Sequence, residues 1–237
     1  MKPRSAIVLQ ARMGSTRLPG KSMAFIEGKT LVHHCIERLR SRSGLMVLLA
    51  TTTLSEDDVL ADEASRLSVP VVRGSAEDVL SRFARAASMF ELTTVVRATA
   101  DNPAVDMDAP RRTLDLLLRT GVDHVVERGL PDGAAVEAVS CDALHRAHAL
   151  ATDAYDREHV TPFLKRDHRF RSLNLLAPAA LRRADRRFTV DTTDDLEFMR
   201  GVYRALGQQT PAPLSAIIHA SDVFLAAELE QPGIGLR

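Results

Sequence analysis

A basic segment rich in small residues follows the first apolar run of the chain. Residues 10–22 read QARMGSTRLPGKS and contain three cations: Arg12, Arg17 and Lys21. Glycine exposes backbone N–H groups to an anion, arginine binds phosphate oxygens with a planar fork, and lysine brings a movable charge. The segment could hold a polyphosphate, although a basic surface loop would have a similar composition. It is not a Walker A loop, because Gly14 and Gly20 are one residue too far apart and Pro19 removes a backbone donor.

Two aspartates far apart in the sequence each follow an apolar run. Asp101 comes after residues 94–98 (TVVRA), and Asp191 comes after residues 188–190 (FTV). Taken one at a time, each is better explained as a turn residue. If both runs are strands of a parallel-type sheet, however, their ends converge on one crevice. We therefore expect the two carboxylates to lie near one another and to face the loop that contains Lys21.

The first half of the chain alternates short apolar runs with helical patterns. The expected strands are residues 6–10, 46–50, 69–72 and 94–98. The expected helices are residues 30–42, a helix after Ser55, residues 75–89 with Ser75 as the N-cap, and residues 107–120. This alternation predicts a mostly parallel sheet with helices on both faces, which binds ligands at the carboxyl ends of its strands.

The second half of the chain is less regular. We expect strands at residues 136–140, 170–176 and 188–190, and helices at residues 141–150, 157–165 and 194–206. No linker, repeat or low-complexity stretch separates the two halves. Residues 1–237 are therefore expected to form a single domain.

Composition restricts the partners of the chain. Lys plus Arg and Asp plus Glu each total 31, so the formal net charge is zero. A neutral chain is a poor candidate for general binding of nucleic acid or anionic membranes. The two cysteines, Cys35 and Cys141, fit a reducing compartment, and no apolar run approaches the length of a membrane span. We expect a cytoplasmic protein.

The basic segment also resembles a known family. The string ARMGSTRLPGK at residues 11–21 is similar to the opening motif of the cytidylyltransferases that activate acidic sugars, among them the CMP-KDO and CMP-sialic acid synthetases. The likeness is greatest to the spore coat polysaccharide branch. It implies a Rossmann-like three-layer α/β/α nucleotidyltransferase fold with a mixed, mostly parallel sheet. It also implies transfer of CMP from CTP to a small acceptor, with Arg12, Arg17 and Lys21 bearing the phosphate charge.

Further strings match the family in the same order along the chain. They are ATT at residues 50–52, RGSAEDVLSRF at 73–83, RATADNP at 97–103 and VDTTDDL at 190–196. The resemblance implies that Asp101 and Asp191 bind Mg²⁺. The implied nucleotide-binding residues are Ala11, Gly14, Ser15, Ala50, Thr51, Arg73, Gly74, Ser75, Asp78 and Thr99. For Asp78, a surface ion pair with Arg82 one helical turn later is an equally good explanation.

The acceptor side is implied by two more segments. Residues 130–137 (LPDGAAVE) and 157–162 (REHVTP) resemble family motifs, which makes Glu137, Arg157 and His159 the implied acceptor-binding residues. Ala135 stands where the family usually has aspartate, so the acceptor is expected to differ from that of the better-known members. The family often forms homodimers through the second half, which here implies residues 123–187.

Two other functions remain open from the sequence. A glycosyltransferase that uses nucleotide sugars would have a related fold and an Asp-x-Asp metal motif, whose spacing occurs at Asp106 and Asp108. That pair lies at an expected helix start, where capping is the simpler explanation. A CTP-binding module without activity would have lost a metal aspartate or the loop lysine, and this chain retains them. A nucleotide other than CTP also remains possible, because backbone groups that read a base leave little trace in sequence.

Overall fold

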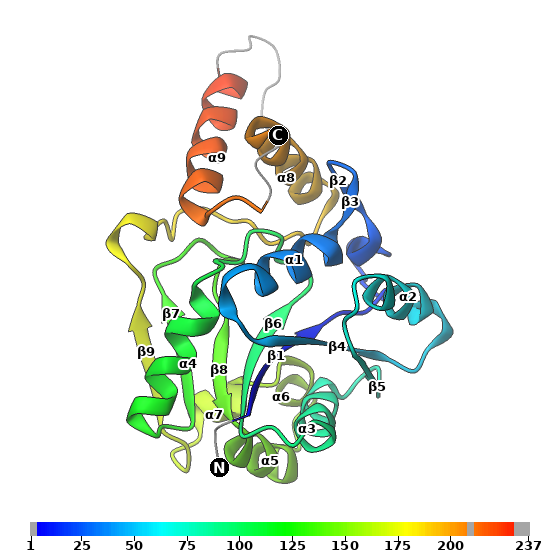
Figure 1. Ribbon diagram of the computed structural model, residues 1–237, viewed down its shortest axis with the longest axis vertical. Coiled ribbons are helices and arrows are strands. Elements are labelled where there is room, and N and C mark those ends of the chain that lie inside the picture. The colour runs from blue at the N-terminus through cyan, green and yellow to red at the C-terminus, as the bar shows by residue number, and fades with distance from the viewer. Residues whose placement is uncertain (1–3, 208–210, 230–237) are drawn as a thin grey trace.

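A seven-stranded sheet forms the centre of the protein. The structure is a computed structural model that describes residues 4–207 and 211–229. The strands lie in the order β5-β4-β1-β6-β8-β7-β9 (Figure 1). Their bounds are β1 Ser5–Gln10, β4 Met46–Thr52, β5 Val71–Gly74, β6 Thr94–Thr99, β7 His124–Arg128, β8 Glu137–Ser140 and β9 Ser172–Leu176. The strands β5, β4, β1 and β6 pair in parallel, and β8 pairs antiparallel with both β6 and β7.

Helices cover both faces of this sheet. Successive strand residues point to opposite faces, so Ile7 packs in one hydrophobic cluster and Val8 in another. The first cluster includes side chains of α1 (Leu31–Ser43), α2 (Asp58–Arg66) and α4 (Ala109–Thr120). The second includes side chains of α3 (Val79–Met89), α5 (Cys141–Leu150) and α7 (Pro162–Arg166), and the short helix α6 (Ala154–His159) lies beside α3. The predicted three-layer fold with a mixed, mostly parallel sheet is confirmed.

A third cluster lies at the end of the molecule drawn uppermost in Figure 1. It joins the hairpin of β2 (Phe25–Ile26) and β3 (Lys29–Thr30) to α8 (Thr193–Leu206) and α9 (Leu214–Leu229). A Cβ atom at Gly201 would lie 2.3 Å from the ring of Phe224. The absence of a side chain at Gly201 therefore lets α9 approach α8.

Two helix predictions need correction. The helix expected from Ser75 begins at Val79, because the Ser75 hydroxyl accepts the amides of Glu77 and Asp78 and forms a turn, while Asp78 is the N-cap. The single helix expected at residues 157–165 is divided into α6 and α7. Val160, between them, has a φ of +71°, which an α-helix does not allow.

The strand predictions were also incomplete. Neither the hairpin of β2 and β3 nor strand β7 was expected; β7 has the sequence HVVER, which shows little apolar alternation. Residues 188–190, expected as a strand, are an extended segment. Its only described pairing is an isolated bridge between the neighbouring Arg187 and Asp132. Asp191 therefore follows no strand of the main sheet.

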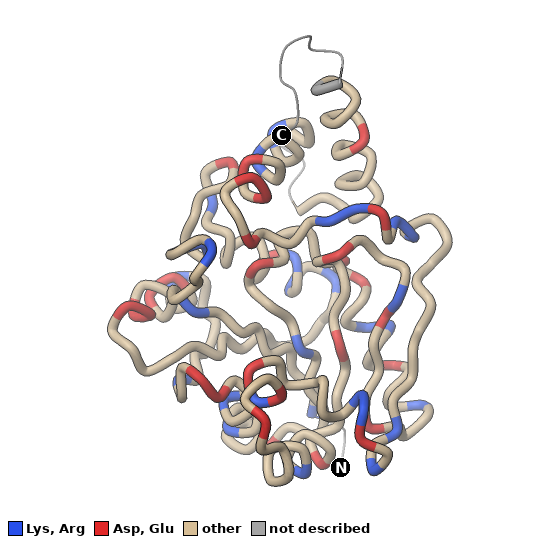
Figure 2. Tube along the Cα trace, turned by 180° about the vertical axis from the view of Figure 1, so that it is seen from behind, with Lys and Arg blue, Asp and Glu red and all other residues tan. Residues whose placement is uncertain are grey.

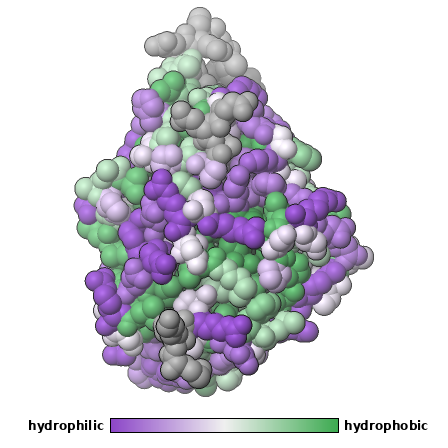
Figure 3. All heavy atoms as spheres, in the orientation of Figure 1, coloured by the Kyte–Doolittle hydropathy of each residue, from purple (hydrophilic) through white to green (hydrophobic). Residues whose placement is uncertain are grey.

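Residues of both charges are scattered along the chain trace in the view of Figure 2, and neither sign is gathered in one region there. On the face seen in Figure 3, hydrophobic patches alternate with hydrophilic ones. Within the described ranges, 4–207 and 211–229, every helix is too short or too polar to cross a lipid bilayer.

Candidate active site

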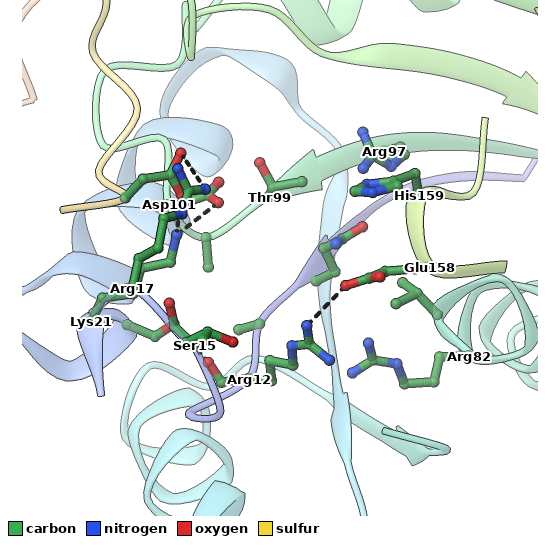
Figure 4. A pocket seen from close by; sticks show the side chains of 17 residues that line it. Arg12, Ser15, Arg17, Lys21, Arg82, Arg97, Thr99, Asp101, Glu158 and His159 are labelled. Carbon is green, nitrogen blue, oxygen red and sulfur yellow. Dashed lines mark hydrogen bonds and ion pairs between the residues drawn. The ribbon is translucent and has the colours of Figure 1, made fainter. Parts of the chain in front are cut away.

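A cavity of about 330 Å³ opens at the carboxyl ends of β1 and β6 (Figure 4). Nine of the predicted site residues line it: Ala11, Arg12, Ser15, Arg17, Lys21, Thr99, Asp101, His159 and Asp191. The loop after β1, the end of β6, helix α6 and the segment before α8 each supply some of these residues. The cavity is therefore built from parts of the chain that are far apart in sequence.

The loop after β1 folds back on itself, and the buried Asp57 links it to β4. The amides of Ser15 and Gly20 both donate to the carbonyl of Met13, at 2.8 and 3.0 Å, and Gly20 adopts a left-handed φ of +75°. The amide of Met13 in turn donates to Oδ1 of Asp57 at 2.7 Å. Asp57 is fully buried, and its Oδ2 accepts from the hydroxyl of Thr51 at the end of β4. One carboxylate thus fixes the loop against the sheet.

Lys21 joins the two aspartates at one end of the cavity. Its Nζ lies 3.1 Å from Oδ2 of Asp101, 2.8 Å from Oδ1 of Asp191 and 2.8 Å from the carbonyl oxygen of Val190. The two carboxylates are therefore near neighbours that face the loop containing Lys21, as expected. The amide of Val190 donates to the carbonyl of Asp101 at 2.8 Å, which holds this segment against the end of β6 although it is not a strand.

Asp191 is the more strongly held carboxylate. Its Oδ2 also forms an ion pair with Arg17 at 3.0 Å and accepts a hydrogen bond from Arg187 at 2.6 Å. Partial burial would raise the pKa of Asp191, but hydrogen bonds from Lys21 and Arg187 and the charges of Lys21 and Arg17 keep that pKa below its ordinary value. The carboxylate is therefore ionised at neutral pH. Asp195 completes a capping box with Thr192 at the start of α8, as its position at the helix start predicts.

The side chains at this end fit a magnesium ion that takes its other ligands from phosphate and water. They do not fit a metal that is bound by protein ligands alone. Asp101 and Asp191 supply hard carboxylate oxygens, and Mg²⁺ is bound in proteins by one or two carboxylates together with phosphate oxygens and water. No group of three or more His, Cys, Asp or Glu side chains among the described residues could hold a metal. An ion here would need ligands from a bound phosphate compound and from water.

The other end of the cavity is rich in arginine. Arg12 donates to Glu158 at 2.9 Å and to the carbonyl of Ala76 at 3.3 Å. Arg82 is only 1% exposed, yet its Nε and Nη1 atoms have no hydrogen-bond partner among the described residues. Burial and the nearby charge of Arg12 lower the pKa of Arg82 to about 10, so it remains a cation. This end therefore offers buried N–H donors to a ligand.

Several predicted nucleotide-binding residues lie beside this cavity rather than on its wall. Ala50 and Thr51 are completely buried under the loop. The guanidinium of Arg73 is occupied by Asp58 at 2.6 Å and by backbone carbonyls. Gly74 is required for another reason, because a Cβ there would lie 2.8 Å from Cγ of Arg82. Gly14 is also off the wall, and a Cβ there would lie 3.1 Å from Oε1 of Glu56.

The alternative explanation of Asp78, a surface ion pair with Arg82, is wrong. Asp78 caps α3 and accepts two hydrogen bonds from Arg157, at 2.9 and 2.5 Å. Arg157 also donates to the carbonyls of His148 and Ala151 at the end of α5. Arg157 therefore ties α6 to α3 and α5.

The other two predicted acceptor residues differ in position. Glu137 accepts from His124 at 3.1 Å and from Lys165 at 2.7 Å, and it does not line the cavity. Only His159 reaches the wall.

Eight wall residues were not predicted: Gln10, Thr16, Ser22, Val79, Arg82, Arg97, Ala100 and Glu158. All of them stand within the matched or basic strings of the sequence: Gln10, Thr16 and Ser22 in residues 10–22, Val79 and Arg82 in 73–83, Arg97 and Ala100 in 97–103, and Glu158 in 157–162. A basic residue two positions before Thr99 on the same strand was the available signal, because residues two apart on a strand share a face.

The sheet is doubly wound, a basic loop that contains glycine follows its first strand, and two carboxylates lie at the same edge. This combination is typical of enzymes that bind nucleotides. Comparison with known proteins specifies the class. The profile of the cytidylyltransferase family matches residues 6–216, so the chain belongs to this family and is a nucleotidyltransferase.

Individual relatives agree with the family. The chain is 32% identical over 225 residues to the spore coat polysaccharide biosynthesis protein SpsF of Bacillus subtilis, covering 89% of this chain and 91% of that protein. It is 29% identical over 253 residues to a 3-deoxy-manno-octulosonate cytidylyltransferase of Solibacter usitatus, covering 96% and 97%. A cytidylyltransferase structure from Leptospira borgpetersenii superposes with a TM-score of 0.88 at 25% identity, covering 98% of this chain and 100% of that one.

Proposed function

We propose that this protein transfers CMP from CTP to a small acceptor and releases pyrophosphate. The observation that carries the proposal is the position of Lys21, whose amino group lies between Asp101 and Asp191 at the end of the basic loop. A cation-binding pair of carboxylates beside a row of phosphate-binding donors is what nucleotidyl transfer requires, because that reaction depends on positioning and on neutralising phosphate charge.

In the proposed reaction an oxygen of the acceptor attacks the α-phosphorus of CTP. The new oxygen–phosphorus bond forms as the bond from the α-phosphorus to the bridging oxygen breaks, and pyrophosphate leaves in line. Arg12, Arg17 and Lys21 would hold the phosphates and stabilise the charge that develops on the leaving group. Asp101 and Asp191 would hold Mg²⁺, which neutralises phosphate charge and acts as a Lewis acid when bound.

The nucleotide would lie along the loop after β1. Ala11 and Ser15 line the cavity with Thr99, so these residues would contact the nucleotide directly. Ala50 and Thr51 are buried in β4 under the loop, so they would affect nucleotide binding only by holding the loop in position. Family membership favours cytosine as the base.

The acceptor is proposed to be a sugar acid or a related small molecule, in the synthesis of a surface polysaccharide or glycoconjugate. Two relatives, a spore coat polysaccharide biosynthesis protein and a 3-deoxy-manno-octulosonate cytidylyltransferase, support this class of acceptor. Ala135, where the family usually has aspartate, favours an acceptor different from that of the better-known members. We also propose a homodimer through residues 123–187, which analytical ultracentrifugation would test.

A pyrophosphate-release assay tests the proposal. CTP, ATP, GTP and UTP are each supplied with Mg²⁺ and a panel of sugar acids, amino acids and phosphorylated polyols. We expect release with CTP alone among the nucleotides, and a larger rise in melting temperature with CTP than with the others, because ligands that bind the native state stabilise it. Equal thermal shifts for all four nucleotides would contradict the choice of CTP.

The glycosyltransferase alternative has less support in the geometry. Its metal motif would need Asp106 and Asp108 to be free. Asp106 is 3% exposed and pairs with Arg112, whereas Asp108 pairs with Arg42 at 3.2 Å. Transfer of sugar from CDP- or UDP-sugars without pyrophosphate release would nevertheless favour that class.

A further inference from the structure

The order of the strands divides the cavity into two halves. β1 carries the phosphate loop and lies in the middle, with β4 and β5 on one side and β6 and β8 on the other. Arg97 and Thr99 are two residues apart on β6, so they project from the same face, and both line the cavity. Figure 4 shows Arg97 and His159 at the opposite end of the cavity from Lys21 and Arg17.

The charge of Arg97 is not satisfied by hydrogen bonds. Its Nε is buried and has no partner among the residues that the structure describes. Glu137 stands opposite Arg97 in the register of β6 and β8, but it is bonded to His124 and Lys165 instead. A buried N–H of a cation without a partner is unfavourable unless a ligand oxygen accepts from it. Arg97 thus offers an unoccupied donor in the wall of the cavity.

The phosphates of the nucleotide have other partners. Arg12, Arg17 and Lys21 belong to the loop after β1, which lies at the centre of the sheet edge. The acceptor must approach the α-phosphorus from the side opposite to the leaving pyrophosphate. The half of the cavity that Arg97 and His159 line, opposite the end where Lys21 pairs with Asp101 and Asp191, is the side left for the acceptor. A second anionic group bound there would belong to the acceptor.

We propose that Arg97 determines acceptor specificity by binding an anionic oxygen group of the acceptor, either a carboxylate or a phosphate. This inference rests on the proposed function. Arg97 approaches the acceptor from the strand that also carries Thr99 and leads to Asp101, so it would fix the charged group at a set distance from the reacting phosphorus. A planar guanidinium matches both carboxylate and phosphate geometry.

Binding of two small probes tests the proposal without knowledge of the acceptor. The protein is first saturated with Mg²⁺ and α,β-methylene-CTP, which occupies the phosphate loop and does not react. Glycolate is then titrated and followed by saturation-transfer NMR, and inorganic phosphate by the width of its ³¹P resonance. Ethylene glycol is the uncharged control. We expect glycolate, phosphate or both to bind, and ethylene glycol not to bind. The probe that binds identifies the group.

Variants assign that binding to Arg97. Arg97→Gln should weaken it at least about tenfold, since a hydrogen bond to a charged group is lost, while Arg97→Lys should retain part of it. Arg85→Gln, an exposed arginine on α3, is the matched control and should bind like the wild type. The affinity for α,β-methylene-CTP should be the same in every variant, which shows that Arg97→Gln folds.

The outcomes separate the two proposals. If α,β-methylene-CTP does not bind to the wild type, the proposed function fails, and the role of Arg97 fails with it. If the nucleotide binds but neither anion does, or both bind equally well to Arg97→Gln, the role of Arg97 alone is overturned. With any acceptor found in the pyrophosphate assay, Arg97→Gln should raise KM for the acceptor and leave KM for CTP unchanged.

Discussion

Nζ of Lys21 lies 2.8 Å from Oδ1 of Asp191 and 3.1 Å from Oδ2 of Asp101, so one ammonium group pairs with both carboxylates. A divalent cation would bind the same oxygens. In the proposed reaction, lysine and metal would therefore compete as long as no nucleotide is present. A triphosphate would change this balance, because it would offer its own oxygens to Lys21 and release the carboxylates.

The competition gives a prediction for Lys21→Met. Without nucleotide, Mn²⁺ should bind the variant more tightly than the wild type, as measured by the electron paramagnetic resonance signal of free Mn²⁺. Turnover should fall on the order of 10²–10³-fold, the usual loss when one charge stabiliser is removed. Lys29→Met is the control, since Lys29 pairs with Glu37 away from the cavity. Unchanged Mn²⁺ affinity together with unchanged turnover would show that Lys21 neither competes with the metal nor stabilises charge in the reaction.

The two aspartates should act as a unit. Asp101→Asn and Asp191→Asn are each expected to remove most of the activity, and the double variant should be little worse than either, because residues that serve one ion are not additive. Asp194→Asn, in the exposed first turn of α8, should retain activity. Rates of pyrophosphate release at several Mg²⁺ concentrations give the comparison. Losses that multiply in the double variant would mean that the carboxylates have independent roles.

The sequence predicts the fold and the position of Lys21 and Asp101 well, because both depend on patterns within short stretches of the chain. Strands β1, β4 and β6 and helix α1 follow from apolar periodicity, and Lys21 and Asp101 stand directly beside such elements. Asp191 lies near Lys21 as predicted, but it does not follow a strand of the sheet, which was the basis of the prediction. It is held by a backbone bond between Val190 and Asp101 and not by a strand end.

Contacts between distant segments were beyond the sequence argument. Nothing near Asp78 indicates that Arg157 is its partner, and the i,i+4 spacing pointed to Arg82 instead. Arg82 is buried because Gly74, in another element, leaves room for its side chain. Which side chains line a cavity depends on such packing, which periodicity does not report.

Glu137 gives a prediction for pH. Burial would raise its pKa, but the hydrogen bond from His124 and the charges of Arg97 and Lys165 hold that pKa well below its ordinary value of 4.5. A carboxyl with a depressed native pKa stabilises the fold above its unfolded pKa, and this contribution is lost as the pH falls towards the native value. Glu137→Gln should therefore lower the free energy of unfolding at pH 7.

The difference between wild type and Glu137→Gln should shrink as the pH falls below about 4.5, because the Glu137 carboxyl is then increasingly protonated in the unfolded state, whereas glutamine is neutral at every pH. Urea unfolding at pH 7, 5 and 4 measures it. Glu91→Gln is the control, since Glu91 makes an exposed pair with Arg4 whose side chain is 57% exposed. A difference that stays constant across this range would contradict the depressed pKa.

Asp57 should control the phosphate loop without touching its ligand. It is fully buried, and its carboxylate accepts from the amides of Met13 and Thr52 and from the hydroxyl of Thr51, at 2.7, 3.1 and 3.0 Å. Asparagine keeps the shape but replaces one acceptor oxygen by an NH₂ donor, so at least one N–H or O–H donor loses its partner. Asp57→Asn should lower the free energy of unfolding by roughly 1–3 kcal/mol and weaken CTP binding, because the loop is no longer fixed at Met13.

Asp58→Asn is the matched control: its side chain is 58% exposed and pairs with Arg73, so its cost should stay below about 1 kcal/mol. Urea unfolding and calorimetric titration of CTP with Mg²⁺ separate the two effects. If Asp57→Asn lost stability but kept wild-type affinity for CTP, the loop would hold its shape without this anchor, and Asp57 would serve the fold alone.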